Sequence, residues 1–151
     1  MVAGDPAPIK VRVKLRVPFS DVDPLGIVWH GRYPLYFEEG YGAITRAVGL
    51  SYQDFFAVQV AAPIVQMHID YFEPLRLDEE FTIEACLFWC DGARINIEYR
   101  LLKADSSVAA CGYTVQMLVT PDGKPALVPP PLLEACRKKW RAGLLKFDKS
   151  A

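Results

Sequence analysis

The chain has 151 residues, of which 17 are Lys or Arg and 18 are Asp or Glu, so its formal net charge is −1. Hydrophobic residues make up 52% of the chain and charged residues 23%, a globular composition that excludes a disordered chain and a collagen. The near-neutral charge argues against a protein that coats nucleic acid. This length predicts a single domain over residues 1–151.

The charge is uneven, because the last 20 residues hold six Lys or Arg side chains and only two Asp or Glu. No signal-peptide pattern opens the chain, and no stretch reaches the roughly 18 apolar residues that a transmembrane helix needs. The four cysteines form no C-x-x-C motif and no zinc set with the two His. We therefore expect no metal, a cytoplasmic location and reduced thiols at Cys86, Cys90, Cys111 and Cys136.

The first predicted element is a strand over residues 9–19, where apolar residues alternate with Lys and Arg. After a loop, apolar side chains recur three or four residues apart over residues 33–48, which predicts an amphipathic helix that Gly49 ends. This helix contains Gly40 and Gly42, which lower helix propensity. We therefore expect it to pack closely against a flat surface such as a sheet.

Four further strands and a second helix are predicted beyond this helix. Asp91-Gly92 predicts a two-residue hairpin between the second and third of these strands. A helix over about 132–145 follows a run of three prolines. One face of the last strand carries Tyr113, Val115, Met117 and Val119. The four strands are predicted over residues 63–72, 80–89, 93–103 and 108–120.

The order of these elements predicts an α+β fold. Strands joined by hairpins exclude a doubly wound sheet, which needs alternating helical crossovers. We expect one five-stranded antiparallel sheet wrapped around the helix over 33–48. Its core spans about residues 9–130, and the basic helix over about 132–145 follows it.

Asp21, Asp23 and His30 stand in one loop directly before the long helix. A helix start offers unpaired backbone N–H groups and a partial positive charge, which suit a carbonyl oxygen that becomes an oxyanion. A carboxylate beside them acts as a nucleophile or as a general base on water. Gly26 and Gly31 permit close backbone approach. The loop has the parts for acyl transfer, but Asp before a helix is also a common cap.

Other chemistries lack their sequence patterns. A calcium loop that starts at Asp21 would need an acidic residue where Arg32 stands. The chain contains no G-x-S-x-G, no G-x-G-x-x-G and no P-loop. These absences argue against an α/β-hydrolase, a dinucleotide-binding fold and a P-loop nucleotide site.

The loop resembles the signature of the hot-dog-fold acyl-CoA thioesterases of the 4-hydroxybenzoyl-CoA thioesterase family. The resemblance continues weakly through Ala62-Pro63-Ile64-Val65 and Asp70-Tyr71-x-x-Pro74, and the predicted strand order resembles the family over about residues 9–130. The signature is specific because many fixed positions fall within one short loop. It reads here Asp21-x-Asp23-x-x-Gly26-x-Val28-x-His30-x-x-Tyr33, with Glu38 following on the helix.

The resemblance implies the hot-dog fold and makes Asp23, the second Asp of the signature, the catalytic carboxylate. It also implies that His30 takes part in catalysis, with the backbone N–H at this position directed to the thioester oxygen. The family works as dimers or tetramers with sites at subunit interfaces, which the Pro63-Ile64 stretch is expected to line from across the interface. The candidate substrate-binding residues are Gly26, Val28, Trp29, Gly31, Tyr33, Pro63 and Ile64.

The expected function is hydrolysis of an acyl-CoA or acyl-carrier-protein thioester to free acid and thiol. Coenzyme A is expected only as part of the substrate, with no other cofactor, and the chain is expected to form a homodimer or homotetramer without nucleic acid. Two alternatives stay open, a hot-dog dehydratase or hydratase and a non-catalytic acyl-thioester binding protein. The candidates for binding the CoA phosphates are Arg76, Arg94, Arg100 and the basic C-terminal residues.

The basic C-terminal helix has three possible roles. Its Leu and Trp side chains predict packing on the sheet or on a neighbouring subunit. Its cations also fit docking of the thioester carrier, whether through CoA phosphates or an acidic carrier protein. Attachment to a membrane surface is the third possibility, and we expect packing instead.

Overall fold

The computed structural model describes residues 4–145. Within these residues, no helix has both the length and the apolar character needed to cross a membrane. Two short 3₁₀ helices, η1 (Phe19–Asp21) and η2 (His30–Arg32), precede the first α-helix. The α-helices are α1 (Tyr33–Val48), α2 (Tyr52–Ala57) and α3 (Pro131–Arg141). The strands are β1 (Ile9–Arg16), β2 (Ile64–Tyr71), β3 (Glu80–Phe88), β4 (Arg94–Lys103) and β5 (Val108–Met117).

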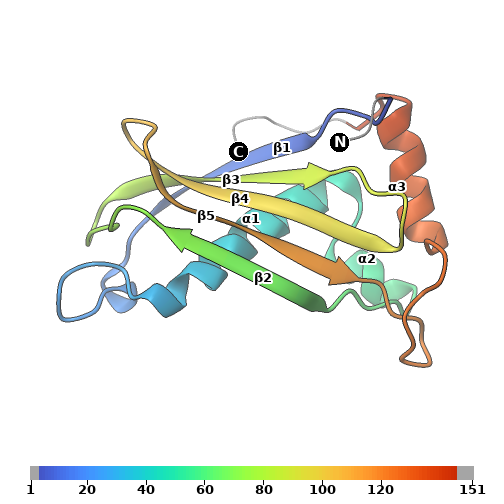
Figure 1. The fold of residues 1–151 in the computed structure, drawn as a ribbon, viewed down its shortest axis with the longest axis horizontal. Coiled ribbons are helices and arrows are strands. Elements are labelled where there is room, and N and C mark those ends of the chain that lie inside the picture. The colour runs from blue at the N-terminus through green and yellow to red at the C-terminus, as the bar shows by residue number, and fades with distance from the viewer. Residues whose placement is uncertain (1–3, 146–151) are drawn as a thin grey trace.

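The five strands form one sheet in the order β1-β3-β4-β5-β2, and every neighbouring pair is antiparallel. Helix α1 lies across one face of this sheet, with the loop that precedes it at one end and α3 at the other (Figure 1). The arrangement confirms the expected α+β hot-dog fold.

Helix α1 covers the predicted residues and ends at Gly49, whose φ of 77° is left-handed and therefore favours glycine. Gly40 lies against the sheet, because a Cβ there would come within 2.9 Å of Ile83 Cγ2 and 3.2 Å of Ala85 Cβ. Gly42 does not contribute to this close packing, since a Cβ there would meet only the side chain of Arg46. The helix buries Tyr33, Tyr36, Phe37, Tyr41, Ile44 and Val48.

The connection between β3 and β4 is longer than the predicted two-residue hairpin. β3 ends at Phe88 and β4 begins at Arg94, so residues 89–93 join them. Arg137 of α3 donates hydrogen bonds to the carbonyl groups of this turn. The prediction was wrong because contact with a distant helix supports a wider turn, which the Asp-Gly pair alone did not reveal.

Strand β5 places its polar residues against α1, which the apolar pattern did not predict. Gly112 leaves room for the Phe37 ring, which lies 2.9 Å from the position a Cβ would occupy. Gln116 Nε2 donates to Ala62 O at 2.7 Å and to Tyr41 Oη at 3.3 Å. These bonds satisfy the buried amide nitrogen and show that Gln116 faces α1. Because successive side chains of a strand point to opposite faces, the predicted Tyr113 face lies on the side of the sheet away from α1.

Helix α2 falls in the segment that we expected to be a link. Its N-cap is Ser51, whose side chain accepts a hydrogen bond from Asp54 N at 3.2 Å, and the Asp54 carboxylate accepts from Ser51 N at 3.0 Å. This reciprocal pair is a capping box. The signal was therefore present in the sequence, although the helix is only six residues long.

Helix α3 packs on the body of the protein, as expected for the basic C-terminal segment. Leu133 and Cys136 are 3% and 4% exposed, and Trp140 Nε1 donates to Ala7 O at 2.9 Å. The helix ends at Arg141, earlier than the predicted residue 145. Its apolar face is thus used for packing within the chain.

Candidate active site

The loop before α1 folds around Asp23. Asp23 N donates to Ile27 O and Gly26 N donates to Asp23 O, each at 2.9 Å. Gly26 has a φ of 76°, so glycine suits this turn. Leu25 N donates to Asp23 Oδ1 at 2.8 Å, while Oδ2 has no hydrogen-bond partner within residues 4–145. One carboxylate oxygen therefore shapes the turn, and the other is available to a ligand.

Asp21 ties this loop to the first turn of α1. Its Oδ2 accepts a hydrogen bond from Tyr36 Oη at 2.7 Å, and Arg32 Nε lies 3.6 Å from its Oδ1. Its backbone carbonyl accepts from Trp29 N at 3.0 Å. Burial, followed by the bond to Asp21, raises the pKa of Tyr36 well above its usual value, so this phenol stays protonated as the donor. Asp21 is therefore a structural anchor of the loop.

The 3₁₀ helix η2, which leads directly into α1, leaves backbone donors free. Arg32 N donates to Trp29 O at 2.9 Å, but the N–H groups of His30 and Gly31 meet no acceptor within residues 4–145. A Cβ at Gly31 would overlap the Trp29 ring, so only glycine fits there in this arrangement. Two unpaired N–H groups at a helix start form a site that favours an anion or a developing oxyanion.

A cavity of about 320 Å³ opens beside this loop. It brings together four of the predicted residues, Asp23, Val28, His30 and Tyr33. Its other walls come from Tyr71 at the end of β2 and from Phe72, Glu73 and Pro74, which follow it. The segment Asp70-Tyr71-x-x-Pro74 carried part of the family resemblance, and that was the one signal for these missed residues.

The remaining predicted residues lie outside this cavity. Gly26 and Gly31 shape the loop, and Trp29 covers Gly31. Pro63 and Ile64 stand at the opposite end of β2 from Tyr71, roughly 23 Å away for a strand of this length. They therefore do not reach the cavity of their own chain.

The region holds no cluster for a metal ion. No group of three or more His, Cys, Asp or Glu side chains in the described part of the chain is placed to bind one. His68 Nε2 lies 3.0 Å from Asp70 Oδ2 on β2, and both side chains are about half exposed. The polar groups of the cavity thus include two carboxylates, Asp23 and Glu73, together with the His30 imidazole and backbone N–H groups.

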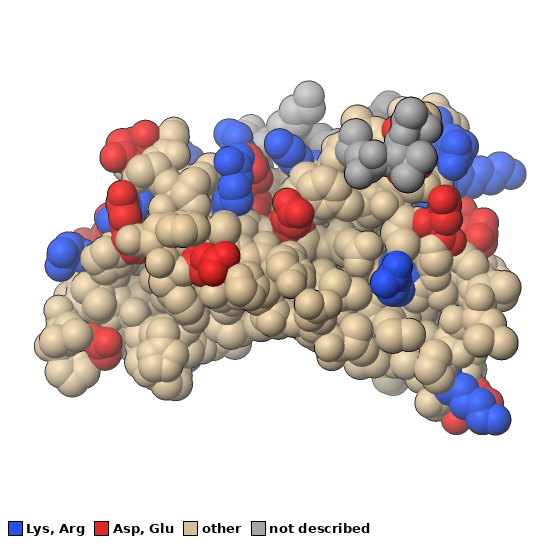
Figure 2. All heavy atoms as spheres, in the orientation of Figure 1, with Lys and Arg blue, Asp and Glu red and all other residues tan. Residues whose placement is uncertain are grey.

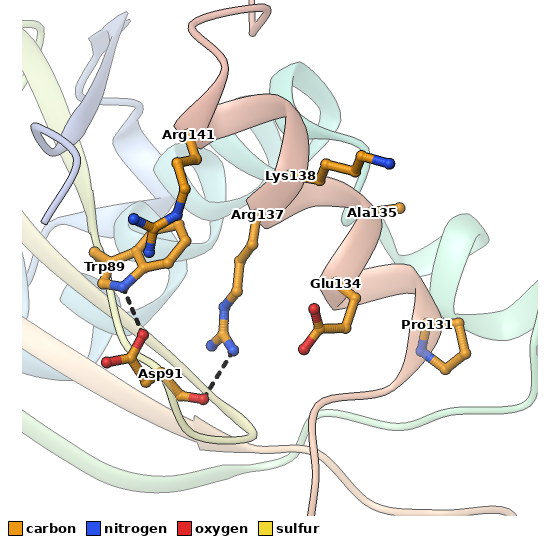
Figure 3. A pocket seen from close by; sticks show the side chains of 8 residues that line it. All are labelled: Trp89, Asp91, Pro131, Glu134, Ala135, Arg137, Lys138 and Arg141. Atoms are coloured by element: carbon orange, nitrogen blue, oxygen red, sulfur yellow. Dashed lines mark hydrogen bonds between the residues drawn. The ribbon is translucent and has the colours of Figure 1, made fainter.

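A larger cavity of about 760 Å³ lies between α3 and the turn that joins β3 to β4. Figure 3 shows Arg137 directed from α3 toward this turn, where it donates to Asp91 O at 3.2 Å, and Arg141 beside the Trp89 ring. The Arg141 guanidinium carbon is 4.7 Å from the ring centre. The cavity also holds the carboxylates of Asp91 and Glu134, so its charge is mixed.

Comparison with known proteins identifies the family. A family model described as the thioesterase-like superfamily matches residues 17–136. The acyl-CoA thioester hydrolase YbgC of Escherichia coli O6:H1 is 27% identical over 97 residues, which cover 64% of this chain and 72% of YbgC. The 1,4-dihydroxy-2-naphthoyl-CoA hydrolase of Synechococcus elongatus is 30% identical over 95 residues, covering 62% of this chain and 70% of that enzyme.

Solved structures share the fold. The protein SAV2348 from Staphylococcus aureus, determined in complex with CoA, superposes with a TM-score of 0.79 at 15% identity and covers 94% of this chain and 90% of its own. The chain therefore belongs to the thioesterase-like superfamily, and its fold is the hot-dog fold of the acyl-CoA thioesterases.

Proposed function

We propose that the chain hydrolyses an acyl thioester of CoA or of an acyl carrier protein to a free acid and a thiol, in the cavity beside Asp23. One observation carries the proposal. Asp23 and His30 line one cavity, and the backbone N–H groups of His30 and its neighbour Gly31 meet no acceptor within residues 4–145, in a chain of the thioesterase-like superfamily.

The N–H groups at the start of α1 polarise the thioester carbonyl in this proposal. As the carbonyl carbon is attacked, its oxygen gains negative charge, which these donors and the helix dipole stabilise. Loss of one such donor typically costs about 10²–10³ in rate. His30 lines the same cavity, and in this proposal its side chain interacts with the departing thiolate.

Asp23 supplies the attack on the carbonyl carbon by one of two routes. As a general base it takes a proton from water, whose oxygen bonds to the carbon as the C–S bond breaks and the thiolate leaves. As a nucleophile its carboxylate oxygen bonds to the carbonyl carbon as the C–S bond breaks and the thiolate leaves, and water then hydrolyses the resulting acyl anhydride. Single-turnover hydrolysis in ¹⁸O-water tests the nucleophilic route. Label enters the Asp23 carboxylate only by this route, when water attacks the Asp23 carbonyl carbon of the anhydride. Attack of water on the acyl carbon, in either route, places the label in the released acid and leaves Asp23 unlabelled.

The cavity walls favour a compact acyl group. Tyr33 and Tyr71 meet edge to face with ring centres 4.8 Å apart, and Phe72 adds a third aromatic side chain. A cavity of about 320 Å³ with aromatic walls suits a short or aromatic acyl chain better than a long one. The acyl preference is part of the proposal.

The chain forms a homodimer or homotetramer through β2 in this proposal. β2 pairs only with β5, so its other edge has no strand partner within residues 4–145. Figure 2 shows few charged atoms along the lower edge of the molecule, where β2 runs in Figure 1. Unpaired apolar edges attract a second strand. The exposed apolar side chains of β2 and the residue after it are Ile64, Val65, Met67, Tyr71 and Phe72.

Antiparallel pairing of two β2 strands supports the proposed role of Pro63 and Ile64. If the strands pair about their midpoint, the first residues of one copy lie beside the last residues of the other. Tyr71 ends β2 and lines the cavity. Pro63 and Ile64, distant from the cavity of their own chain, therefore come close to that of the second copy.

The substrate phosphates need cations, and two of the candidate arginines differ in their contacts. Arg76 forms a backbone bridge with Ile27 of the loop, whereas Arg100 is already bonded to Glu84. Arg76 is therefore our candidate for the phosphates.

We place the reaction in the reducing cytoplasm, because all four cysteines are free thiols.

A panel of benzoyl-, short-chain and long-chain acyl-CoA esters tests the function, with release of free thiol measured by a thiol reagent. We expect release from at least one compact ester. Tight binding of acyl-CoA without thiol release would favour the binding-protein alternative. Release from none of the esters, without binding, would contradict the proposal.

A further inference from the structure

Tyr71 connects the edge strand to the start of α1. It is the last residue of β2, and its Oη donates a hydrogen bond to His30 O at 2.9 Å. Its ring meets the buried Tyr33 ring edge to face at 4.8 Å and 84°. Tyr33 is 3% exposed, so the aromatic contact holds the Tyr71 ring against a fixed part of α1.

The accepting carbonyl belongs to the same peptide group as the Gly31 N–H. A trans peptide is planar, so its C=O and N–H point in opposite directions. A donor on the carbonyl therefore fixes the direction of the N–H, and hydrogen bonds in series also polarise one another. The Gly31 N–H meets no acceptor within residues 4–145, and Gly31 directly follows His30, which lines the cavity with Asp23.

We propose that Tyr71 is a positioning residue for thioester hydrolysis, whose hydroxyl orients and polarises the His30–Gly31 peptide so that Gly31 N–H is ready to bind the oxyanion. This inference rests on the function proposed above. Tyr71 acts through the peptide and does not contact the reacting atoms.

The exposure of Tyr71 separates this role from a purely structural one. Tyr71 is 49% exposed in the single chain, and its hydroxyl makes one hydrogen bond within residues 4–145, the bond to His30 O. The bond therefore contributes little to global stability. A variant that lacks only the hydroxyl should fold normally and reveal its effect in the rate of the chemical step.

Tyr71→Phe is the test, with Tyr113→Phe as the matched control. Tyr113 Oη accepts a hydrogen bond from Gln66 Nε2 at 3.0 Å, so each variant loses one phenolic bond, but Tyr113 has no contact with the start of α1. Because a lost oxyanion donor costs about 10²–10³, we expect a weakened one to lower kcat about tenfold. KM should stay within about twofold and the unfolding temperature should not change.

The outcomes separate this inference from the proposed function. A tenfold lower kcat for Tyr71→Phe, with Tyr113→Phe near the wild type, supports the positioning role. Wild-type kcat in Tyr71→Phe, or a raised KM with kcat unchanged, overturns it while the hydrolase function stands. If the wild-type protein releases no thiol from any ester, the proposed function fails and this inference falls with it.

Discussion

Replacing Gly40 with alanine tests how closely α1 approaches the sheet. A Cβ at Gly40 would lie 2.9 Å from Ile83 Cγ2, 3.2 Å from Ala85 Cβ and 3.3 Å from Tyr99 Cδ1. Ile83, Ala85 and Tyr99 are at most 2% exposed, so none of them can move freely. Overpacking of this kind typically costs about 1–3 kcal/mol.

Gly42→Ala is the matched control, because the two glycines lie two residues apart in the same helix. A Cβ at Gly42 would approach only Arg46 Nη1, at 2.8 Å, the end of a flexible side chain that can move away. Both variants gain about 1 kcal/mol of helix propensity. This gain cancels in the comparison, so Gly40→Ala should be less stable than Gly42→Ala by about 1–3 kcal/mol.

Urea unfolding followed by circular dichroism measures this difference. The chain concentration must be equal for all samples, because oligomer formation would make apparent stability depend on it. We expect Gly42→Ala to be more stable than the wild type and Gly40→Ala to be less stable than Gly42→Ala. Equal stabilisation by both substitutions would refute the close contact between α1 and the sheet.

Three further predictions concern the supports of the fold. Glu84 is 3% exposed; burial opposes its charge, but its two arginine partners outweigh burial and lower its pKa. The ionised Glu84 therefore stabilises the fold above its unfolded-state pKa, and this stabilisation is lost as the pH falls through its folded-state pKa. Glu84→Gln should cost about 1–3 kcal/mol of stability at neutral pH. In unfolding experiments at acid pH, the difference in stability between this variant and the wild type should close. Arg137→Met should lower stability in thermal unfolding by about 1–3 kcal/mol, because it leaves turn carbonyls without their donor; an unchanged midpoint would contradict that role. Tyr36→Phe should lower both stability and the rate of thiol release, because it removes the hydrogen bond that Tyr36 Oη donates to Asp21 in the loop before α1. Full activity in this variant would show that catalysis does not need this bond.

The helix and the order of strands could be predicted because they depend on local pattern. The apolar spacing over residues 33–48 and the C-cap at Gly49 are properties of the segment itself, and α1 has those bounds. The face of β5 could not be predicted in the same way. Gln116 is buried because Tyr41 and Ala62 accept its hydrogen bonds, and these partners are distant in the sequence.

In the candidate site, too, the residues of a local motif could be predicted, whereas contacts between distant parts of the sequence could not. Asp23 and His30 could be proposed from the sequence because they belong to one short motif, and both line one cavity in the structure. The bond from Tyr71 to His30 O joins residues 41 positions apart, which periodicity within a segment does not reveal. The edge position of β2, likewise, depends on the pairing of the whole sheet.

The most direct test of the central claim is single-turnover thiol release by Asp23→Asn. Asparagine can still accept the bond that Leu25 N donates to Asp23 Oδ1, so the turn should persist. Asp105→Asn is the control, because Asp105 Oδ1 accepts from Ser107 N at 2.9 Å in a similar turn outside the cavity. We predict that Asp23→Asn lowers the rate by about 10²–10⁴ while Asp105→Asn matches the wild type. Full activity in Asp23→Asn would contradict the assignment of this carboxylate to the reaction.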